Sequence, residues 1–354
     1  MSTADSLTFA GTGTGDPGAA PGRRGLGRAH GKAILLGEHA VVYGGPGLAI
    51  PVPQLTATAT ARPLSCPDDG PHTISFAMTG PGIASPTPVA ADSLQYLLTA
   101  FEEITPAVRR ICVEVVIDCA IPPGRGLGSS AACARAAVLA IADVLDHPLD
   151  ATAVFDLVQV SEKVVHGKAS GIDALTTGAT APLFFHAGTA QELPIAMPGD
   201  SGSRHRPDGF DGLFVVGDSG VNGSTKDAVE QLRRTFDRNA GTQQAFVRQV
   251  SDLTHAALRD LTTGQVSDFG ARLIENHRVL REVGLSTDRI DALVEAALVA
   301  GGLGAKISGG GLGGCMIALA ADPAAAEKVV AGLQEAGAVR TWTVPVGRFA
   351  GHAH

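Results

Sequence analysis

Hydrophobic and polar positions change their period several times along the N-terminal half of the chain, which predicts a mixture of strands and helices. Alternation of apolar and polar residues over 54–63 ("QLTATATARP") and 110–121 ("RICVEVVIDCAI") is typical of strands that turn one face to a core. Apolar residues recur at helical spacing over 130–145 and 151–166, and a further helix is predicted over 89–104.

The C-terminal half repeats this mixture in a different order. "GLFVVGDSG" (212–220) reads as a strand and is followed by helical patterns through about 225–301. "AKISGGGLGGCMIALA" (305–320) indicates a glycine loop between two strands. "DPAAAEKVVAGLQEAG" (322–337) is a helix with a proline near its start, and "VRTWTVPV" (339–346) is the last strand.

The chain is long enough for two domains, each with its own core, since it has 354 residues. Strands and helices follow one another without strict alternation, so we expect an α+β fold in both halves. The segment 186–212 is polar and rich in glycine and proline, which suggests a boundary between domains at 26–205 and 206–354. Residues 1–25 have the composition of a disordered tail.

Composition narrows the class of protein. Hydrophobic residues make up 45% and charged residues 18% of the chain, as in ordinary soluble proteins. A net charge of −8 argues against nucleic acid as the main partner. Five cysteines without a C-x-x-C pair favour a reduced setting over a disulfide framework. No apolar stretch approaches the roughly 18 residues of a membrane span, so we expect a cytoplasmic protein.

A glycine-rich stretch near the middle, "PPGRGLGSSAACARAAVLAI" (122–141), is the first candidate for a ligand loop. Gly126 to Ala131 matches the dinucleotide fingerprint, but two prolines separate it from the preceding strand and the expected acidic residue is missing. Neither Gly31-Lys32 nor Gly167-Lys168 has the spacing of a Walker A loop. The loop instead leads into a helix at Ser129-Ser130, whose free N–H groups favour phosphate. A serine N-cap after an ordinary turn is the alternative.

A second glycine loop spans Gly309 to Gly314. It precedes an apolar strand and therefore opens no helix, so it is not a dinucleotide site either. Five glycines in six positions cost considerable backbone entropy. A tight connection between strands rarely needs so many, and we expect the loop to press against a ligand or against the first loop.

Charged residues near short apolar runs supply candidate chemistry. "GKAILLGEHAVVYG" (31–44) carries Lys32 beside Glu38 and His39. Glu162 lies near the C-terminal end of a predicted helix, where a carboxylate is unfavourable, and this makes it a candidate cation ligand. Asp173 follows a Ser-Gly-Ile turn eleven residues later. Taken singly, an exposed structural lysine would be the commoner explanation of Lys32, and an Asx turn the preferred explanation of Asp173.

Together the three segments resemble the GHMP kinase superfamily, in the family's own order and over residues 31 to about 345. "GRGLGSSAA" after the two prolines resembles the family's middle motif, and "KISGGGLGGC" resembles its C-terminal glycine motif. "GKAILLGEHAVVYG" is similar to the N-terminal motif of the mevalonate kinases in that superfamily. The resemblance implies a two-domain fold, with an N-terminal ribosomal protein S5 domain 2-like part and a C-terminal ferredoxin-like part.

The resemblance also implies a role for each matching residue. Asp173 would act as catalytic base or would orient the acceptor hydroxyl, with Lys32 stabilising the developing charge. Ser130 and Glu162 would hold Mg²⁺. The residues implied to wrap ATP are Gly124, Arg125, Gly126, Leu127, Gly128, Ser129, Ser130 and Ala131. Those implied on the substrate side are Glu38, His39, Thr225, Lys226, Gly310 and Gly311.

The implied reaction is ATP-dependent phosphorylation of the primary alcohol of mevalonate with Mg²⁺, on the route to isoprenoids. Its partner is a small molecule rather than nucleic acid or a membrane, and homodimerisation stays open. The chain departs from the family pattern at Lys168 and Ala174, where members often carry Asn, and at Leu312 within the glycine run. Alternatives are a superfamily kinase for phosphomevalonate, homoserine or a sugar, and a catalytically inactive ligand-binding member.

Overall fold

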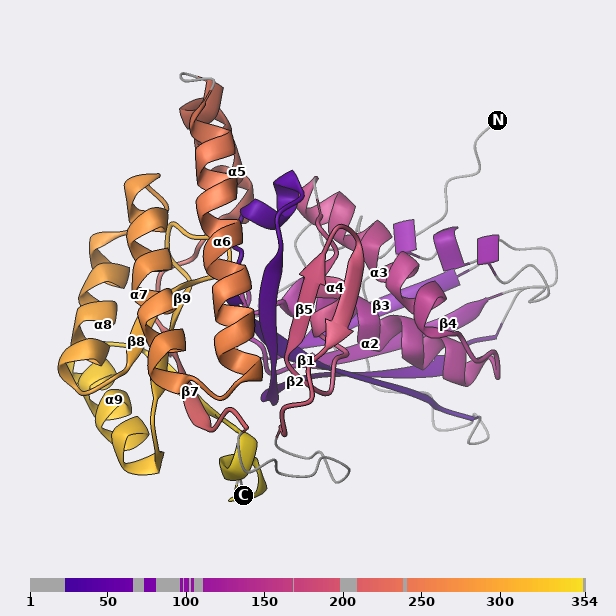
Figure 1. The fold of residues 1–354 in the computed structure, drawn as a ribbon. Helices are drawn as coiled ribbons and strands as arrows, with labels where there is room; N and C mark the ends of the chain where they lie inside the picture. The colour runs from indigo at the N-terminus through magenta and orange to yellow at the C-terminus, as the bar shows by residue number, and fades with distance from the viewer. Residues whose placement is uncertain are drawn as a thin grey trace. The chain divides into compact units, whose positions relative to one another are not determined.

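The computed structural model describes residues 23–65, 73–80, 111–167, 169–197, 209–237 and 241–352, together with 96–97, 99–101 and 103–104. The chain forms two compact units, which we describe separately (Figure 1). Unit 1 takes the chain up to Gly31, then Leu55–Pro122 and Ser129–Ala169. Unit 2 takes Lys32–Gln54, Pro123–Gly128 and the chain from Ser170 onward. The units interleave along the chain, and the division expected near residue 205 stays a prediction.

Unit 1 contains strands that pair in both directions. Strands β1 (Gly25–Leu36) and β2 (Gly47–Pro63) pair with each other, and each is divided between the two units. The later part of β2 pairs antiparallel with β4 (Cys112–Cys119), and β4 pairs parallel with β3 (Thr73–Thr79). Alternate alanines of β2 are fully buried, which confirms the strand that the sequence pattern predicts over 54–63.

Helices α2 and α3 belong to unit 1 and agree closely with the sequence. Helix α3 (Ala151–His166) has the predicted bounds, and its N-cap Asp150 accepts a hydrogen bond from the Ala153 amide at 2.8 Å. Helix α2 (Ser129–Val144) begins one residue earlier than predicted, so both serines lie in its first turn. Helix α2 packs so closely on β1 that a Cβ at Gly27 would lie 2.0 Å from the Ala136 carbonyl oxygen.

Unit 2 is built on a four-stranded antiparallel sheet in the order β10-β7-β9-β8. Its strands are β7 (Gly212–Asp218), β8 (Gly304–Ser308), β9 (Cys315–Ala320) and β10 (Arg340–Val346). The helices of this part are α5 (Thr225–Asp237), α6 (Thr242–Thr262), α7 (Val266–Glu282), α8 (Asp288–Val299) and α9 (Pro323–Glu335). All of these elements fall where the sequence pattern predicts them.

Helices cover both faces of this sheet, which explains why β7 is buried along its whole length and is apolar up to its last residue, Asp218. Phe214 of β7 contacts Phe269 of α7 on one face, with ring centroids 5.9 Å apart. Gly217 lies three residues further along the strand and so faces the other way, toward Leu333 of α9. The second glycine loop connects β8 and β9 at one edge of this layer.

A smaller layer of unit 2 holds η1 (Ala40–Tyr43), α4 (Ile172–Thr176), β5 (Leu183–His186) and β6 (Thr189–Glu192). Strand β5 pairs antiparallel with the first residues of β2. The β5–β6 hairpin falls partly in the segment that the sequence suggested as a domain boundary, where we predicted no strand. Every residue of β6 is exposed, so the segment lacks the alternation that marks a strand with one buried face. The chain ends in η2 (Gly347–His352).

Some sequence-based expectations need correction or lie outside the described residues. Cys112 is disulfide-bonded, so the expectation of a fully reduced chain is wrong at this position, whereas Cys119, Cys133 and Cys315 carry free thiols. The cytoplasmic location stays a prediction. The predicted tail of residues 1–25 lies almost entirely outside the described residues, which begin at residue 23. Most of the helix predicted over 89–104 lies outside them as well. Among the described helices, none has the length and apolar character to cross a bilayer.

Candidate active site

Lys32 and Asp173, 141 positions apart in the printed sequence, form an ion pair in unit 2. The Lys32 Nζ lies 2.9 Å from the Asp173 Oδ1. The lysine side chain is 3% exposed, whereas that of the aspartate is 33% exposed. A buried ammonium group therefore holds a carboxylate that solvent or a small molecule can reach. The structure brings together the two residues that the sequence proposed as catalytic.

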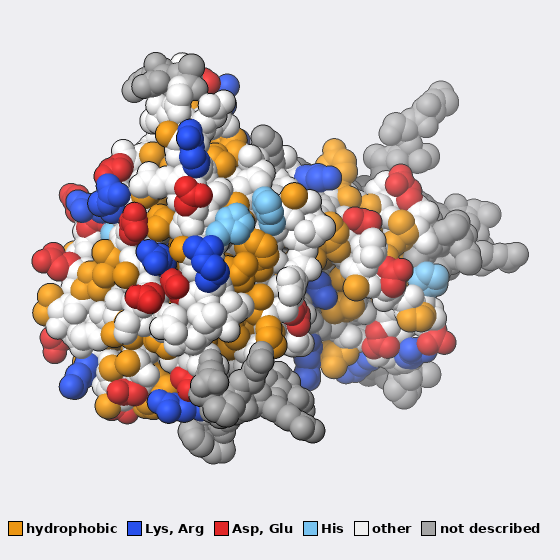
Figure 2. Space-filling view, viewed as in Figure 1, with side chains coloured by type: hydrophobic (Ala, Val, Ile, Leu, Met, Phe, Trp, Pro, Cys, Tyr) orange, Lys and Arg blue, Asp and Glu red, His pale blue; other side chains and the backbone are white. Residues whose placement is uncertain are grey.

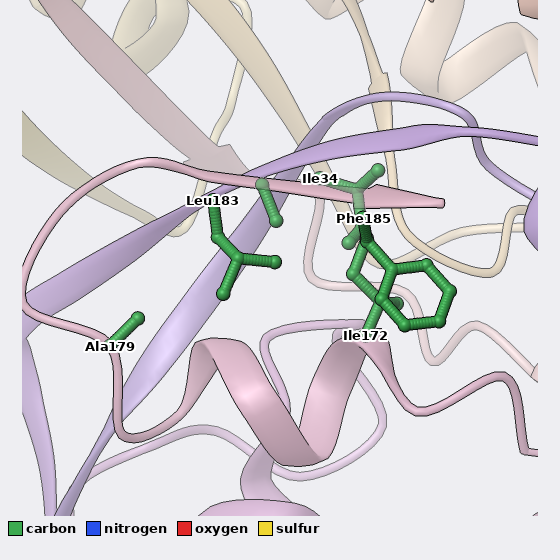
Figure 3. Close-up of a cluster of buried hydrophobic side chains, with 6 residues drawn as sticks. Ile34, Ile172, Ala179, Leu183 and Phe185 are labelled. Carbon is green, nitrogen blue, oxygen red and sulfur yellow. The ribbon is translucent and has the colours of Figure 1, made fainter. Parts of the chain in front are cut away.

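A cluster of apolar side chains explains why these two residues meet. Ile34 lies two residues after Lys32 on β1 and so on the same face of the strand, and Ile172 directly precedes Asp173 in α4. Figure 3 shows Ile34 and Ile172 gathered with Leu183 and Phe185 between α4 and the neighbouring strands. Burial of this cluster stabilises α4 against β1 and β5, and the ion pair lies beside it.

The two glycine loops lie against each other, as the sequence suggested. A Cβ placed on Gly309 would be 3.1 Å from the Cα of Gly126, so the backbones approach too closely for side chains. Lys32 contacts the first loop as well. Its amide donates to the Leu127 carbonyl at 3.0 Å, and a Cβ on Gly128 would lie 2.9 Å from the Lys32 Cγ. The catalytic candidates and the glycine loop of residues 124–128 thus form one cluster within unit 2.

Two residues from the implied substrate side lie in the same cluster. Thr225 begins α5 and contacts the second glycine loop, because a Cβ on Gly310 would lie 2.4 Å from the Thr225 Oγ1. Lys226 follows with an exposed side chain. Gly311 adopts a positive φ of 87°, and its neighbour Leu312 fixes the loop by donating its amide to the Leu285 carbonyl at 2.8 Å. The leucine that interrupts the glycine run therefore anchors the loop to the segment that carries Leu285.

Glu38 is buried and its carboxylate is used inside the protein. One oxygen pairs with the Lys306 ammonium, and the other accepts from the Asn276 side chain at 3.2 Å. Both Glu38 and Lys306 side chains are at most 1% exposed. Burial lowers the pKa of Lys306, and the charge of Glu38 opposes that shift. Glu38 thus ties the start of η1 to β8 and α7, and its implied place on the substrate side stays a prediction.

His39 is hydrogen-bonded to the second glycine loop. Its Nε2–H donates to the Gly310 carbonyl at 2.8 Å, which fixes the tautomer because a carbonyl oxygen only accepts. Burial lowers the pKa of His39 to about 4, against a smaller raising effect of that hydrogen bond. The residue also has a positive φ of 60°, which is strained for a residue with a Cβ. His39 is therefore neutral at pH 7 and set in a special backbone conformation.

The implied metal ligands, Ser130 and Glu162, belong to unit 1. Ser130 lies in the first turn of α2, and Glu162 lies in the last turns of α3, where it is 2% exposed. The pKa of the Cys133 thiol is raised by its hydrogen bond with Cys119, by burial, and by the charges of Cys119 and Glu162. Cys133 is one helical turn after Ser130, so Glu162 acts electrostatically on the part of α2 that carries this serine.

The remaining residues implied to bind ATP lie in the first glycine loop and in the first turn of α2. Gly124, Gly126 and Gly128 all have positive φ values, at 68°, 72° and 75°, so the loop exposes backbone in a way that side chains would oppose. Ser129 and Ala131 follow in the first turn of α2. The Arg125 side chain is turned toward other segments of unit 2 and pairs with Asp218.

Sequence reasoning missed Lys306 and Asn276, which hold Glu38 in place. A signal for Lys306 was present in the sequence, since it is a lone charged residue in the apolar run "AKIS" before the glycines. A lysine at a buried strand position requires a counter-charge. Asn276 lies in a helix whose pattern gave no indication of a buried polar role.

Comparison with known proteins finds two family models that match this chain. The family model described as the GHMP kinases N terminal domain matches residues 95–179, and that described as GHMP kinases C terminal matches residues 256–339. The mevalonate kinase of Pyrococcus abyssi is 30% identical over 331 residues, which cover 88% of this chain and 92% of the relative.

Solved structures show the same fold. The mevalonate kinase of methicillin-resistant Staphylococcus aureus has a TM-score of 0.65 and 28% identity, over 91% of this chain and 98% of the other. Lactococcus lactis galactokinase, solved with galactose, has a TM-score of 0.68 at 17% identity, over 92% and 94% of the two chains. The fold by itself thus occurs with different acceptors, and the choice of substrate depends on side chains.

Proposed function

The chain belongs to the GHMP kinase family, and we propose that it transfers the terminal phosphoryl group of ATP to the primary alcohol of mevalonate, giving 5-phosphomevalonate. Use of ATP follows from the family. The name shared by the Pyrococcus and Staphylococcus relatives supports mevalonate as the acceptor. Acidic and basic side chains are interspersed on the face drawn in Figure 2 rather than gathered into one area of a single sign.

The observation that carries the proposal is the Lys32–Asp173 ion pair beside two touching glycine loops. Phosphoryl transfer asks chiefly for positioning and for neutralisation of charge. Asp173 is the group that can accept the proton of the acceptor hydroxyl or orient that hydroxyl. Lys32 fixes the aspartate and stabilises negative charge on the attacking oxygen.

We propose that Ser130 and Glu162 hold Mg²⁺. A hydroxyl and a carboxylate are oxygen ligands of the kind that Mg²⁺ prefers, and this ion usually binds one or two carboxylates together with substrate phosphates. Within the described residues no cluster of three or more acidic, histidine or cysteine side chains could hold a metal alone, which agrees with that mode. When bound, the ion neutralises phosphate charge. Replacing Glu162 by Gln should raise the Mg²⁺ concentration at half-maximal rate, and an unchanged titration would contradict this role.

On the acceptor side we propose His39, Thr225 and Lys226, with the backbone of Gly310 and Gly311. Thr225 and Gly310 lie in contact, and His39 holds the carbonyl of Gly310. Lys226 carries an exposed positive charge that suits a carboxylate such as that of mevalonate. Glu38 contributes indirectly, since its ion pair with Lys306 fixes the turn that presents His39.

A coupled assay for ADP release tests the proposal directly. Purified protein with ATP and Mg²⁺ is given mevalonate, phosphomevalonate, homoserine or galactose, and kcat/KM should be highest for mevalonate. The N-terminal motif favours this over a sugar, since the chain has Gly-Glu-His-Ala-Val where galactokinases favour Gly-Glu-His-Thr-Asp. A preference for another acceptor would overturn the substrate but keep the kinase. No turnover with any alcohol, in protein that binds ADP, would favour the inactive ligand-binding member instead.

A further inference from the structure

Arg125 lies in the glycine loop that is proposed to wrap ATP, yet its guanidinium points into unit 2. Its Nε lies 2.8 Å from the Asp218 Oδ1, Nη1 donates to the Asn222 Oδ1, and Nη2 donates to the Gly220 carbonyl at 3.0 Å. Nη1 and Nη2 are thus hydrogen-bonded to the segment 218–222, whereas Nε lies within ion-pair distance of Asp218 without forming a hydrogen bond. The side chain is only 15% exposed. A phosphate-binding arginine would instead leave its fork open toward the ligand.

Asp218 explains why the arginine adopts this position. It is the last residue of β7, and its side chain is 4% exposed. The same oxygen accepts the Gly220 amide at 2.9 Å, which turns the chain out of the strand. A buried carboxylate needs a cation close by, and Arg125 supplies it. The positive charge of Arg125 is therefore matched by Asp218 rather than by a triphosphate.

Backbone hydrogen bonds also connect the segment after Asp218 to both glycine loops. The Gly223 amide donates to the Gly124 carbonyl at 2.9 Å, and the Gly314 amide donates to the Val221 carbonyl at 2.8 Å. The segment 219–223 is thus bonded to the first glycine loop and to the end of the second. Two residues further on, Thr225 opens α5 and contacts Gly310. The position of the implied acceptor-side residues depends on how this segment is held.

We propose that Arg125 is a positioning residue, which fixes the segment 218–226 against the nucleotide loop and thereby places Thr225 and Lys226 for the acceptor. The identity of the acceptor rests on the proposed function, whereas the clamp formed by Arg125, Asp218 and Asn222 does not. Loss of the clamp changes acceptor binding and turnover. It leaves the affinity for nucleotide phosphates nearly unchanged.

A double-mutant cycle with Arg125→Met and Asp218→Asn tests this role. Each single variant should lower kcat/KM for mevalonate by about tenfold or more, mainly through the KM for mevalonate. The double variant should lose no more than the worse single variant, because both changes break one interaction. Arg125→Lys keeps the positive charge but lacks the planar guanidinium group, and should recover part of the kcat/KM that Arg125→Met loses. Arg278→Met is the matched control, since Arg278 forms an ion pair with Glu282 in which both side chains are 56% exposed.

Two measurements without acceptor separate this inference from the proposed function. The Kd for ADP, measured by titration calorimetry, should change by less than about threefold in Arg125→Met, whereas loss of a phosphate ligand would weaken it by about tenfold or more. Hydrogen exchange at the Gly223 amide should become faster in Arg125→Met and stay unchanged in Arg278→Met. A large loss of ADP affinity in Arg125→Met but not in Asp218→Asn would overturn the inference. So would unchanged exchange at Gly223, whatever alcohol the wild-type chain phosphorylates.

Discussion

The buried ion pair between Glu38 and Lys306 offers a quantitative test of how unit 2 is held together. Both side chains are at most 1% exposed, so neither charge has water available if its partner is removed. Breaking a buried pair by removing one partner usually costs about 3–5 kcal/mol, since the other charge stays buried. We expect Lys306→Met to lower the free energy of unfolding by about 3–5 kcal/mol, and Glu38→Gln by a similar amount.

The double variant distinguishes loss of the pair from loss of packing. With both charges removed, no uncompensated ion remains, and Gln at position 38 can still accept from Asn276. Glu38→Gln/Lys306→Met should therefore be more stable than the sum of the single effects predicts, by about 2 kcal/mol or more. The Lys306 ammonium also donates to the Ile307 carbonyl at 2.5 Å, so the double variant should stay below wild type.

Urea unfolding at pH 7 measures these differences, and the chain provides its own reporter. Its single tryptophan, Trp342, lies in β10 of unit 2, opposite Val216 of β7. Tryptophan fluorescence therefore follows the unit that contains the ion pair, and equal m-values among the variants would show that the same unfolding is compared. Arg278→Met again serves as the surface control. Single variants that each lose less than about 1 kcal/mol, or strictly additive effects, would refute the view that these two buried charges compensate each other.

Three further predictions follow from the site. Asp173→Asn should reduce kcat by at least about 10²-fold, with the calorimetric Kd for ADP changed little, and near-wild-type turnover would remove this residue from the mechanism. Ile172→Ala should lower the free energy of unfolding by about 2–4 kcal/mol and also reduce kcat, because α4 loses the contact that fixes Asp173; full activity at reduced stability would show that the cluster only stabilises. His39 has a folded pKa of about 4, below its ordinary value of about 6.5, so stability should fall as pH drops from 6.5 to 4, by about 3 kcal/mol from this residue. In His39→Gln that part of the pH dependence should disappear from urea titrations, and an unchanged slope would contradict the shift.

Local pattern was a good guide to the elements of this fold. The alternation of β2, the glycine-flanked strands β8 and β9 and the bounds of α3 all follow from short-range periodicity and capping residues. The β5–β6 hairpin was missed because β6 is exposed throughout and carries no hydrophobic period. Both Ala187 and Gly188 of its turn have positive φ, but only Gly188 offered a local signal, because alanine is not among the residues that such turns favour.

For the candidate site, too, some features could be predicted from local sequence and others depended on tertiary packing. Its glycine loops could be recognised in the sequence, because close approach of two backbones requires residues without a Cβ and therefore glycine. Lys32 and Asp173 could be named from their motifs, but their contact depends on the packing of Ile34 and Ile172 from distant segments.

Residue types at positions of demanding local geometry can thus be read from the chain alone, namely the glycines of both loops, the serines that open α2 and the apolar strands around them. The partners of the charged residues follow only from the folded structure. Glu38 is bound by Lys306, and Arg125 is bound by Asp218, through contacts between segments that lie far apart in the chain. The physical reason is that secondary structure is specified by neighbours along the chain, whereas the partner of a buried charge is chosen by three-dimensional packing, which short-range periodicity does not record.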